Sequence, residues 1–274
     1  MDGAVSEPAP ALLRDLACAA ARVAGQIALD GFGGDIRVDY KADRSEVTEF
    51  DRAAEAAVIE FLRAQRPGDG FLGEELGYRA GGGGTGARPT VTWVVDPIDG
   101  TRNFSRGMPM FACSVGALVD GVPVAGAVYH PTRDEMYSAA TGVGAWLGES
   151  RLPALPCDPP GAGRGSLVVA IPSHHTAATD ARVRAIVERR VVRSLGCTTL
   201  HMAMVAAGRF DAALMNNCKL WDIAAGWVIV GEAGGVATDL SGGSHFPLGV
   251  DAYASQSLPT LVGSPYAHGV VSRE

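Results

Sequence analysis

The sequence lacks several features that would assign it to common protein classes. No apolar run approaches the roughly 18 residues that a membrane-spanning helix requires. The first residues also lack the basic stretch and apolar segment of a secretory signal. The five cysteines are odd in number and form no Cys-x-x-Cys pair, which disfavours a disulfide framework or a zinc ribbon. These absences favour a cytoplasmic protein with no membrane partner.

Positive charge is also scarce. The chain has 23 Lys and Arg residues against 30 Asp and Glu residues, and this net charge of −7 argues against a nucleic-acid partner. A phosphorylated substrate is still allowed, because metal ions and backbone N–H groups can bind phosphate in an acidic protein. Residues 81–86 match G-x-G-x-x-G, but no clear strand precedes them and no clear helix follows, so we predict no dinucleotide site.

The length of 274 residues allows one large domain or two intimately packed halves, and 47% apolar residues are enough for a sizeable core. Residue patterns predict helices over 9–30, 48–66, 177–189, 198–207 and 222–233. They predict strands over 91–95, 112–119, 122–129, 167–171, 191–194, 210–215 and 261–263. The Pro- and Gly-rich residues 152–165 predict a boundary between two packed halves, approximately 1–155 and 156–274.

Three short segments place carboxylates where strands or loops are predicted to end. They are Gly73-Glu74-Glu75, Asp96-Pro-Ile-Asp99-Gly-Thr101 and Trp221-Asp222. We expect the strand over 91–95 to end at Asp96 and Pro97 to lead the chain out of the sheet. Taken alone, each segment is more typical of a turn, a solvated pair or a helix cap. Taken together, they indicate a site for a hard divalent cation such as Mg²⁺, which prefers oxygen ligands.

These segments resemble the signature motifs of the inositol monophosphatase family. The matching strings are Gly73-Glu-Glu75, Trp93-Val-Val-Asp-Pro-Ile-Asp-Gly-Thr-Arg-Asn-Phe104, Trp221-Asp-Ile-Ala-Ala-Gly226, Val47-Thr-Glu-Phe-Asp51 and Glu232-Ala-Gly-Gly235. The similarity runs from about residue 41 to residue 240. It implies a layered αβαβα sandwich of the inositol monophosphatase and fructose-1,6-bisphosphatase type, usually a homodimer. It also implies a Mg²⁺-dependent, lithium-sensitive phosphomonoesterase.

The resemblance assigns metal ligands residue by residue. Glu74, Asp96 and the Ile98 carbonyl would hold a first Mg²⁺ ion. Asp96, Asp99 and Asp222 would hold a second, and Glu74 would touch a weaker third. The expected cofactor is therefore two to three Mg²⁺ ions per active site.

The resemblance also assigns catalytic and phosphate-binding roles. Thr101, hydrogen-bonded to Asp51, would orient the attacking water, with Glu74 beside it. The backbone of Gly100 and Thr101 would bind phosphate, and Asp222 would border the substrate. No side-chain nucleophile is needed, because a metal ion lowers the pKa of water toward neutrality.

The substrate side of the family pattern is less complete. Arg193-Ser-Leu-Gly196-Cys-Thr198 resembles the family element in which Gly196 and Thr198 border the substrate. Inositol-specific members place a glutamate after the next strand, where this sequence has Met215. A thioether is only a weak hydrogen-bond acceptor, so this departure weakens the case for inositol phosphate itself.

Several substrates therefore remain open. Inositol 1-phosphate or a related cyclitol phosphate is the first expectation, followed by histidinol phosphate, because residues 66–70 and 103–109 also look like histidinol-phosphate phosphatases. Sugar bisphosphates and 3′-nucleotides are further alternatives. A non-catalytic binding homologue is disfavoured, because such a protein has no reason to keep all these acids.

Three other pairs of residues allow simpler interpretations. Cys113 and Cys197 have no His partner in sequence, so we predict buried thiols rather than nucleophiles. His174 and His175 follow a proline and are expected to face solvent. Arg102 and Arg106 follow the acidic turn, where they could reach a substrate anion or serve as surface charge.

Overall fold

The computed structural model describes residues 9–42, 44–81, 91–158, 166–174 and 176–274. Its helices are α1 (Pro10–Gly31), α2 (Glu49–Gln65), α3 (Thr101–Phe104), α4 (Ala177–Arg189), α5 (Thr198–Ala206), α6 (Leu220–Glu232) and α7 (Pro265–Val271). A 3-10 turn, η1, spans Pro131–Arg133. Among these described residues, no helix is both long and apolar enough to cross a membrane.

The strands form three sheets. A small ribbon pairs β1 (Val38–Tyr40) with β2 (Glu46–Thr48). The large sheet, in the order β10-β9-β8-β7-β6-β5-β3-β4, contains β3 (Gly70–Gly73), β4 (Gly77–Arg79), β5 (Thr92–Asp99), β6 (Ala112–Val119), β7 (Val122–His130), β8 (Glu135–Ala140), β9 (Gly144–Leu147) and β10 (Ser150–Arg151). The smaller sheet, in the order β12-β11-β13-β15-β14, contains β11 (Val168–Ala170), β12 (Val191–Arg193), β13 (Ala212–Met215), β14 (Val236–Asp239) and β15 (Thr260–Gly263).

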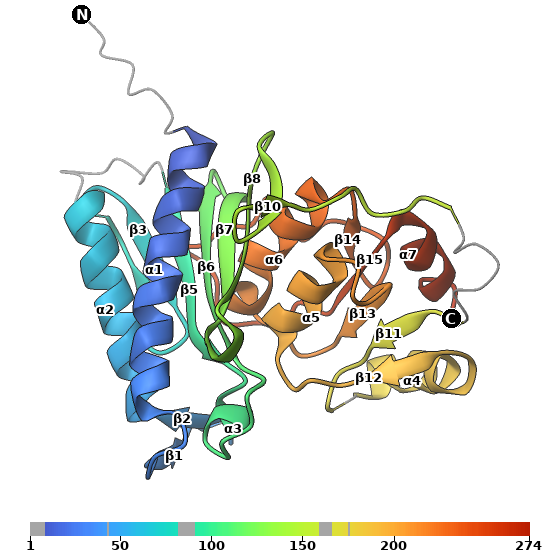
Figure 1. Ribbon diagram of the computed structural model, residues 1–274, viewed down its shortest axis with the longest axis horizontal. Helices are drawn as coiled ribbons and strands as arrows, with labels where there is room; N and C mark the ends of the chain where they lie inside the picture. The colour runs from blue at the N-terminus through green and yellow to red at the C-terminus, as the bar shows by residue number, and fades with distance from the viewer. Residues whose placement is uncertain (1–8, 43, 82–90, 159–165, 175) are drawn as a thin grey trace, which may run out of the picture.

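Helices and sheets alternate in layers, as Figure 1 shows. Helices α1 and α2 cover the outer face of the large sheet, α5 and α6 lie between the two sheets, and α4 and α7 cover the smaller sheet. Each layer buries apolar side chains against the next, which is why every helix needs an apolar face. The expected α+β sandwich with αβαβα layering is confirmed.

The two sheets lie on opposite sides of the predicted boundary. The large sheet ends at Arg151 and the smaller one begins at Val168. A single apolar core nevertheless joins them, because Val94 of the large sheet and Val262 of the smaller sheet share one cluster with α5 and α6. The middle helices therefore fix the two halves against each other.

Helix α2 begins as its sequence predicts. The Thr48 hydroxyl accepts hydrogen bonds from the backbone N–H groups of Phe50 and Asp51, while Asp51 Oδ2 accepts from the Thr48 N–H at 2.8 Å. This reciprocal capping box satisfies N–H groups that a helix start leaves unpaired. It also holds the Asp51 side chain in a fixed, buried position.

One expectation was wrong at the centre of the acidic motif. Strand β5 does not end at Asp96 but continues to Asp99, and Pro97 does not lead the chain out of the sheet. The register instead shifts, with Asp96 opposite Ser114 and Asp99 opposite Ala112. Proline is tolerated in such a bulge because the ladder needs no N–H there, and pairing resumes beyond it.

Other boundaries moved for local reasons. Helix α6 begins at Leu220 rather than Asp222, because the Asp222 carboxylate reaches back to the Lys219 N–H. The short strands β1 to β4 and β14 were not predicted, since three or four residues carry little periodicity. Most of the glycine-rich stretch over 81–86 lies outside the described residues.

Candidate active site

Three carboxylates predicted as metal ligands meet at one point. One ligand oxygen each from Asp96, Asp99 and Asp222 lies within 4.8 Å of the others. Asp96 and Asp99 flank the bulge of β5, and Asp222 lies in the first turn of α6. The cluster therefore forms where the large sheet meets the middle helix layer.

The protein's own groups do not compensate the negative charge of this cluster. Both carboxylate oxygens of Asp96 are buried and have no hydrogen-bond partner among the described residues. Burial, together with the charges of Glu74 and Asp99, raises the pKa of Asp96 well above its usual range. Burial and the charge of Asp99 likewise raise the pKa of Asp222. Unpaired buried carboxylates cost free energy. An all-oxygen, negatively charged donor set therefore fits a hard divalent cation such as Mg²⁺.

The second half of the chain holds Asp99 in place. Its Oδ2 accepts a hydrogen bond of 2.6 Å from the Thr199 N–H and one of 3.1 Å from the Cys197 thiol. The free N–H groups at the start of α5 thus bind a carboxylate from β5. Cys197 is buried, as predicted, but sequence reasoning missed this contact because nothing in the sequence links it to Asp99.

Glu74 stands beside the cluster rather than within it. Its Oε1 lies 2.7 Å from Lys41 Nζ, which also lies 2.5 Å from Glu75 Oε1. Its negative charge nevertheless contributes to the raised pKa of Asp96. The first predicted metal site is therefore less closely assembled than the second, and Lys41 is a neighbour that sequence reasoning missed.

The predicted pair of Thr101 and Asp51 is in contact. Thr101 Oγ1 lies 3.2 Å from Asp51 Oδ1 and 3.0 Å from the Ile98 carbonyl. Burial raises the pKa of Asp51 to about 6. Because a hydroxyl has one hydrogen and two lone pairs, Thr101 can donate to Asp51 while accepting a hydrogen bond from water.

Gly100 shapes the predicted phosphate-binding turn. It adopts a left-handed conformation with φ 89° and precedes α3. A Cβ atom there would lie 2.9 Å from the Met110 carbonyl. The position therefore requires glycine on two counts, conformation and space.

A pocket of 180 Å³ collects the predicted substrate residues. It brings together Gly196, Thr198 and Met215, which come from different elements. Its other lining residues are Pro172, Ser173, His174, Cys197, His201, Asn216, Asn217 and Cys218. Cys197 links it to the acidic cluster through Asp99. The role of each residue stays a prediction, but their meeting in one pocket follows from the fold.

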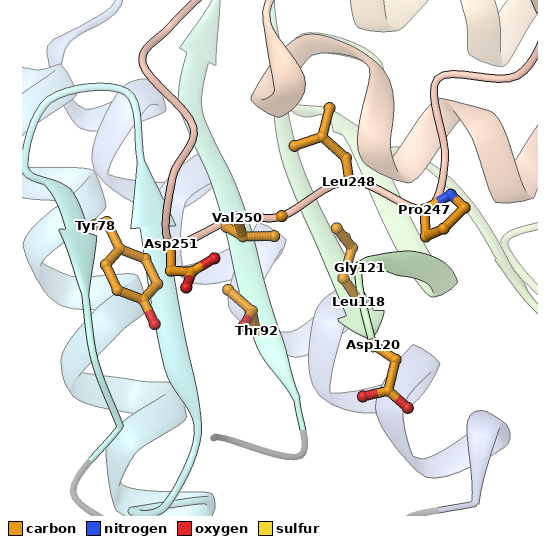
Figure 2. Close-up of a pocket in the computed structure, with 10 residues that line it drawn as sticks. Tyr78, Thr92, Leu118, Asp120, Gly121, Pro247, Leu248, Val250 and Asp251 are labelled. Atoms are coloured by element: carbon orange, nitrogen blue, oxygen red, sulfur yellow. The ribbon is translucent and has the colours of Figure 1, made fainter. Parts of the chain in front are cut away.

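A larger pocket of 340 Å³ lies elsewhere and contains none of the predicted site residues. Figure 2 shows it between Tyr78, Thr92 and Leu118 of the large sheet and the loop over 247–251. Among the described residues that line it, Asp120 and Asp251 carry charge. Size alone therefore does not identify the active site of this protein.

His201 supports the pocket as a neutral side chain. Its Nε2 accepts a 2.9 Å hydrogen bond from the Leu195 N–H, and burial lowers its pKa to about 4. Protonation would remove that acceptor and place a charge in the core. The loop before α5 therefore depends on His201 remaining neutral.

We expect His201 to make the protein sensitive to acid. A histidine whose pKa is lowered by folding stabilises the fold above its unfolded pKa of about 6.5, and this contribution is lost as pH falls toward 4. The loss amounts to roughly 2 to 3 kcal/mol between pH 7.5 and 4.5. Urea unfolding at both pH values should show a smaller loss for His201→Gln than for wild type. Equal losses would contradict this, and His174→Gln, at an exposed site, is the matched control.

Comparisons with known proteins agree with the geometry. A profile of the Inositol monophosphatase family matches residues 10–266. An inositol-1-monophosphatase of Mesorhizobium japonicum is 36% identical over 236 residues, covering 82% of this chain and 84% of that protein.

Solved structures show the same fold. The extragenic suppressor protein SuhB of Bartonella henselae superimposes with a TM-score of 0.82 at 30% identity, covering 96% of this chain and 97% of that one. An IMPase of Thermotoga maritima gives a TM-score of 0.79 at 28% identity, with 94% of each chain covered. The sequence match extends over nearly the whole chain, and the fold carries the acidic cluster where strand β5 meets the start of α6. The chain therefore belongs to the inositol monophosphatase family and is a phosphoric monoester hydrolase.

Proposed function

We propose that this protein is a Mg²⁺-dependent phosphatase of small polyol phosphates, with inositol 1-phosphate or a related cyclitol phosphate as the first candidate. The observation that carries the proposal is the cluster of Asp96, Asp99 and Asp222, in which Asp96 is buried and neither of its carboxylate oxygens has a hydrogen-bond partner among the described residues. The name of the Mesorhizobium relative supports the choice of substrate.

Asp96, Asp99 and Asp222 would hold Mg²⁺, with the Ile98 carbonyl and Glu74 as neighbouring donors. Bound there, Mg²⁺ supplies positive charge that neutralises the phosphate and lowers the pKa of water. Two to three ions per site belong to this proposal.

The protein itself orients water and phosphate. Thr101 Oγ1 donates to Asp51 Oδ1, so its lone pair accepts a hydrogen from the attacking water and aims that water at phosphorus. The water proton passes by way of Thr101 to Asp51, whose pKa of about 6 suits a base near neutral pH. The N–H groups of Gly100 and Thr101 bind the phosphate oxygens. The new P–O bond forms as the bond to the alcohol breaks, and the alcohol oxygen then takes a proton from solvent.

One motif that suggested histidinol phosphate has a structural role. Asp69 accepts hydrogen bonds of 3.0 Å from Arg66 Nη2 and 2.8 Å from Trp93 Nε1. These contacts secure the turn between α2 and β3 against β5. These contacts account for the motif without a direct role in binding substrate, so histidinol phosphate stays an alternative.

A panel of phosphomonoesters tests the proposed function. Purified protein should release phosphate from inositol 1-phosphate in the presence of Mg²⁺ and release none after EDTA treatment. Histidinol phosphate, fructose 1,6-bisphosphate and 3′-AMP in the same assay separate the alternative substrates. No release from any of them would contradict the proposal and favour a binding protein.

Met215 is expected to limit activity on inositol 1-phosphate. If the substrate ring contacts this buried side chain, the ring lacks the charge-assisted hydrogen bond that a glutamate at this position would accept. Such a bond is worth about 1.5–3 kcal/mol. Met215→Glu should therefore raise kcat/KM on inositol 1-phosphate about 10- to 100-fold relative to other phosphomonoesters. Met215→Leu is the control without an acceptor. An unchanged ratio for Met215→Glu would show that this residue does not contact the ring.

Further properties belong to the same proposal; the first two below rest on the family resemblance and the third on the sequence composition. They are inhibition by Li⁺, a homodimeric assembly and a cytoplasmic location. All five cysteines are free, as a reducing environment requires.

A further inference from the structure

An arginine that the proposed chemistry does not use contacts a residue that lines the substrate pocket. Arg102 follows Thr101 directly, and its Nη1 lies 3.3 Å from Nε2 of His174, a pocket-lining residue. Its side chain is 53% exposed. Asn103 fixes this arrangement, because its Nδ2 donates to the Leu195 carbonyl at 2.7 Å and so ties α3 to the pocket wall. Arg102 therefore stands between the proposed phosphate-binding turn and the pocket.

The charges around Arg102 do not balance. The side chain of Glu46 is only 5% exposed. Arg106 Nη1 lies 3.1 Å from each of its two carboxylate oxygens. It also accepts a 2.9 Å hydrogen bond from Ser105, whereas Arg102 Nε reaches it only at 3.4 Å. Two guanidinium groups thus share one carboxylate. One positive charge is in excess, and the weaker contact leaves Arg102 as the group free to bind an anion.

The residues that line the pocket also favour a negatively charged group. Among the residues that the structure describes, no Asp or Glu lines this pocket. The Asn216 amide is already engaged, since it donates to the His174 carbonyl. Ser173, Thr198 and Asn217 can all donate hydrogen bonds. The part of a substrate that extends beyond the phosphate turn and Asp222 into this pocket meets hydrogen-bond donors, with the Arg102 cation beside them.

We propose that Arg102, with His174, selects phosphomonoesters that carry a second anionic group, either a carboxylate or a second phosphate. The inference rests on the proposed phosphatase function and narrows its substrate class. A guanidinium matches either anion through paired hydrogen bonds. The same charge disfavours a cationic substrate such as histidinol phosphate. Because Arg102 is half exposed, the preference is modest and weakens with added salt.

Three substrates that share one sugar and one anomeric phosphate test this selection. Glucose 1-phosphate has no second anion, glucuronic acid 1-phosphate adds a carboxylate, and glucose 1,6-bisphosphate adds a phosphate. We expect wild-type kcat/KM for release of the phosphate at carbon 1 to be about 10-fold higher for at least one anionic substrate. The two anionic substrates distinguish a carboxylate from a phosphate. The preference should shrink when NaCl is raised from about 50 to about 500 mM.

Variants assign the preference to Arg102. Arg102→Gln should bring the ratio of kcat/KM values close to one, and Arg102→Lys should retain part of the preference. Arg22→Gln removes the same charge from a side chain of α1 that is 52% exposed and pairs with Asp134, and it should leave the ratio unchanged. A wild type that treats all three substrates alike, or a preference that survives in Arg102→Gln, would overturn the inference while leaving the phosphatase intact. Failure to release phosphate from any substrate would instead overturn the proposed function.

Discussion

Asp96→Asn should lower kcat/KM by at least about 100-fold, because the substitution removes a charged ligand from the centre of the proposed metal site. The same change should stabilise the metal-free protein. Folding raises the pKa of this buried carboxyl, so its ionised form destabilises the fold at neutral pH. Replacing it with a neutral amide should increase the free energy of unfolding by about 1–2 kcal/mol without metal. Activity and stability would therefore move in opposite directions.

Thermal unfolding with and without Mg²⁺ tests both parts. Wild type should gain in Tm when Mg²⁺ is added, because binding to the folded state alone stabilises it. Asp96→Asn should lose most of that gain. Asp120→Asn, an exposed acid in the β6–β7 turn, is the matched control and should behave as wild type. A variant that keeps more than about a tenth of the activity would contradict the assignment of Asp96.

Thr101→Val should lower kcat by about 100-fold or more, in the range typical of a lost general acid–base group. Valine keeps the shape of the side chain but has no hydroxyl to connect the attacking water with Asp51. Because Mg²⁺ binding does not require this hydroxyl, the Mg²⁺-dependent gain in Tm should persist. Steady-state kinetics and unfolding on the same preparation separate the two effects.

Thr101→Ser is the matched control for this prediction. It restores a hydroxyl at the same position and should recover most of the activity lost in Thr101→Val. Similar defects in both variants would show that the side chain acts through packing near α3. Normal activity in Thr101→Val would exclude the proposed path of the water proton.

The acidic motif could be found from sequence because its parts are local. Asp96, Ile98, Asp99, Gly100 and Thr101 are consecutive or nearly so, and a short motif keeps its chemistry even where the strand boundary is misplaced. The prediction that β5 ends at Asp96 was wrong, yet the carboxylates still converge. A bulge re-aims side chains as effectively as a turn does.

Other parts of the site could not be found in this way, because the sequence gives no sign of which distant segments meet. Lys41, between β1 and β2, contacts Glu74, which follows β3. Cys197, just before α5, contacts Asp99 at the end of β5. The excess charge at Arg102 depends on how Glu46 divides its hydrogen bonds. Each is a side-chain contact between segments with no shared pattern in the sequence.

The sequence by itself determined the family, the alternation of helices and strands, and the identity of the acids. The reason is that short motifs and the periodic spacing of apolar residues involve only residues that are close together in the chain. The tertiary structure decided how these acids are arranged. Packing α5 and α6 between the two sheets brings Asp222 and the Thr199 N–H to the bulge of β5. It also places Met215 and His174 in one pocket and brings Arg102 into contact with His174. The physical reason is that burial and charge balance depend on which surfaces meet, and that is set by the packing of whole layers.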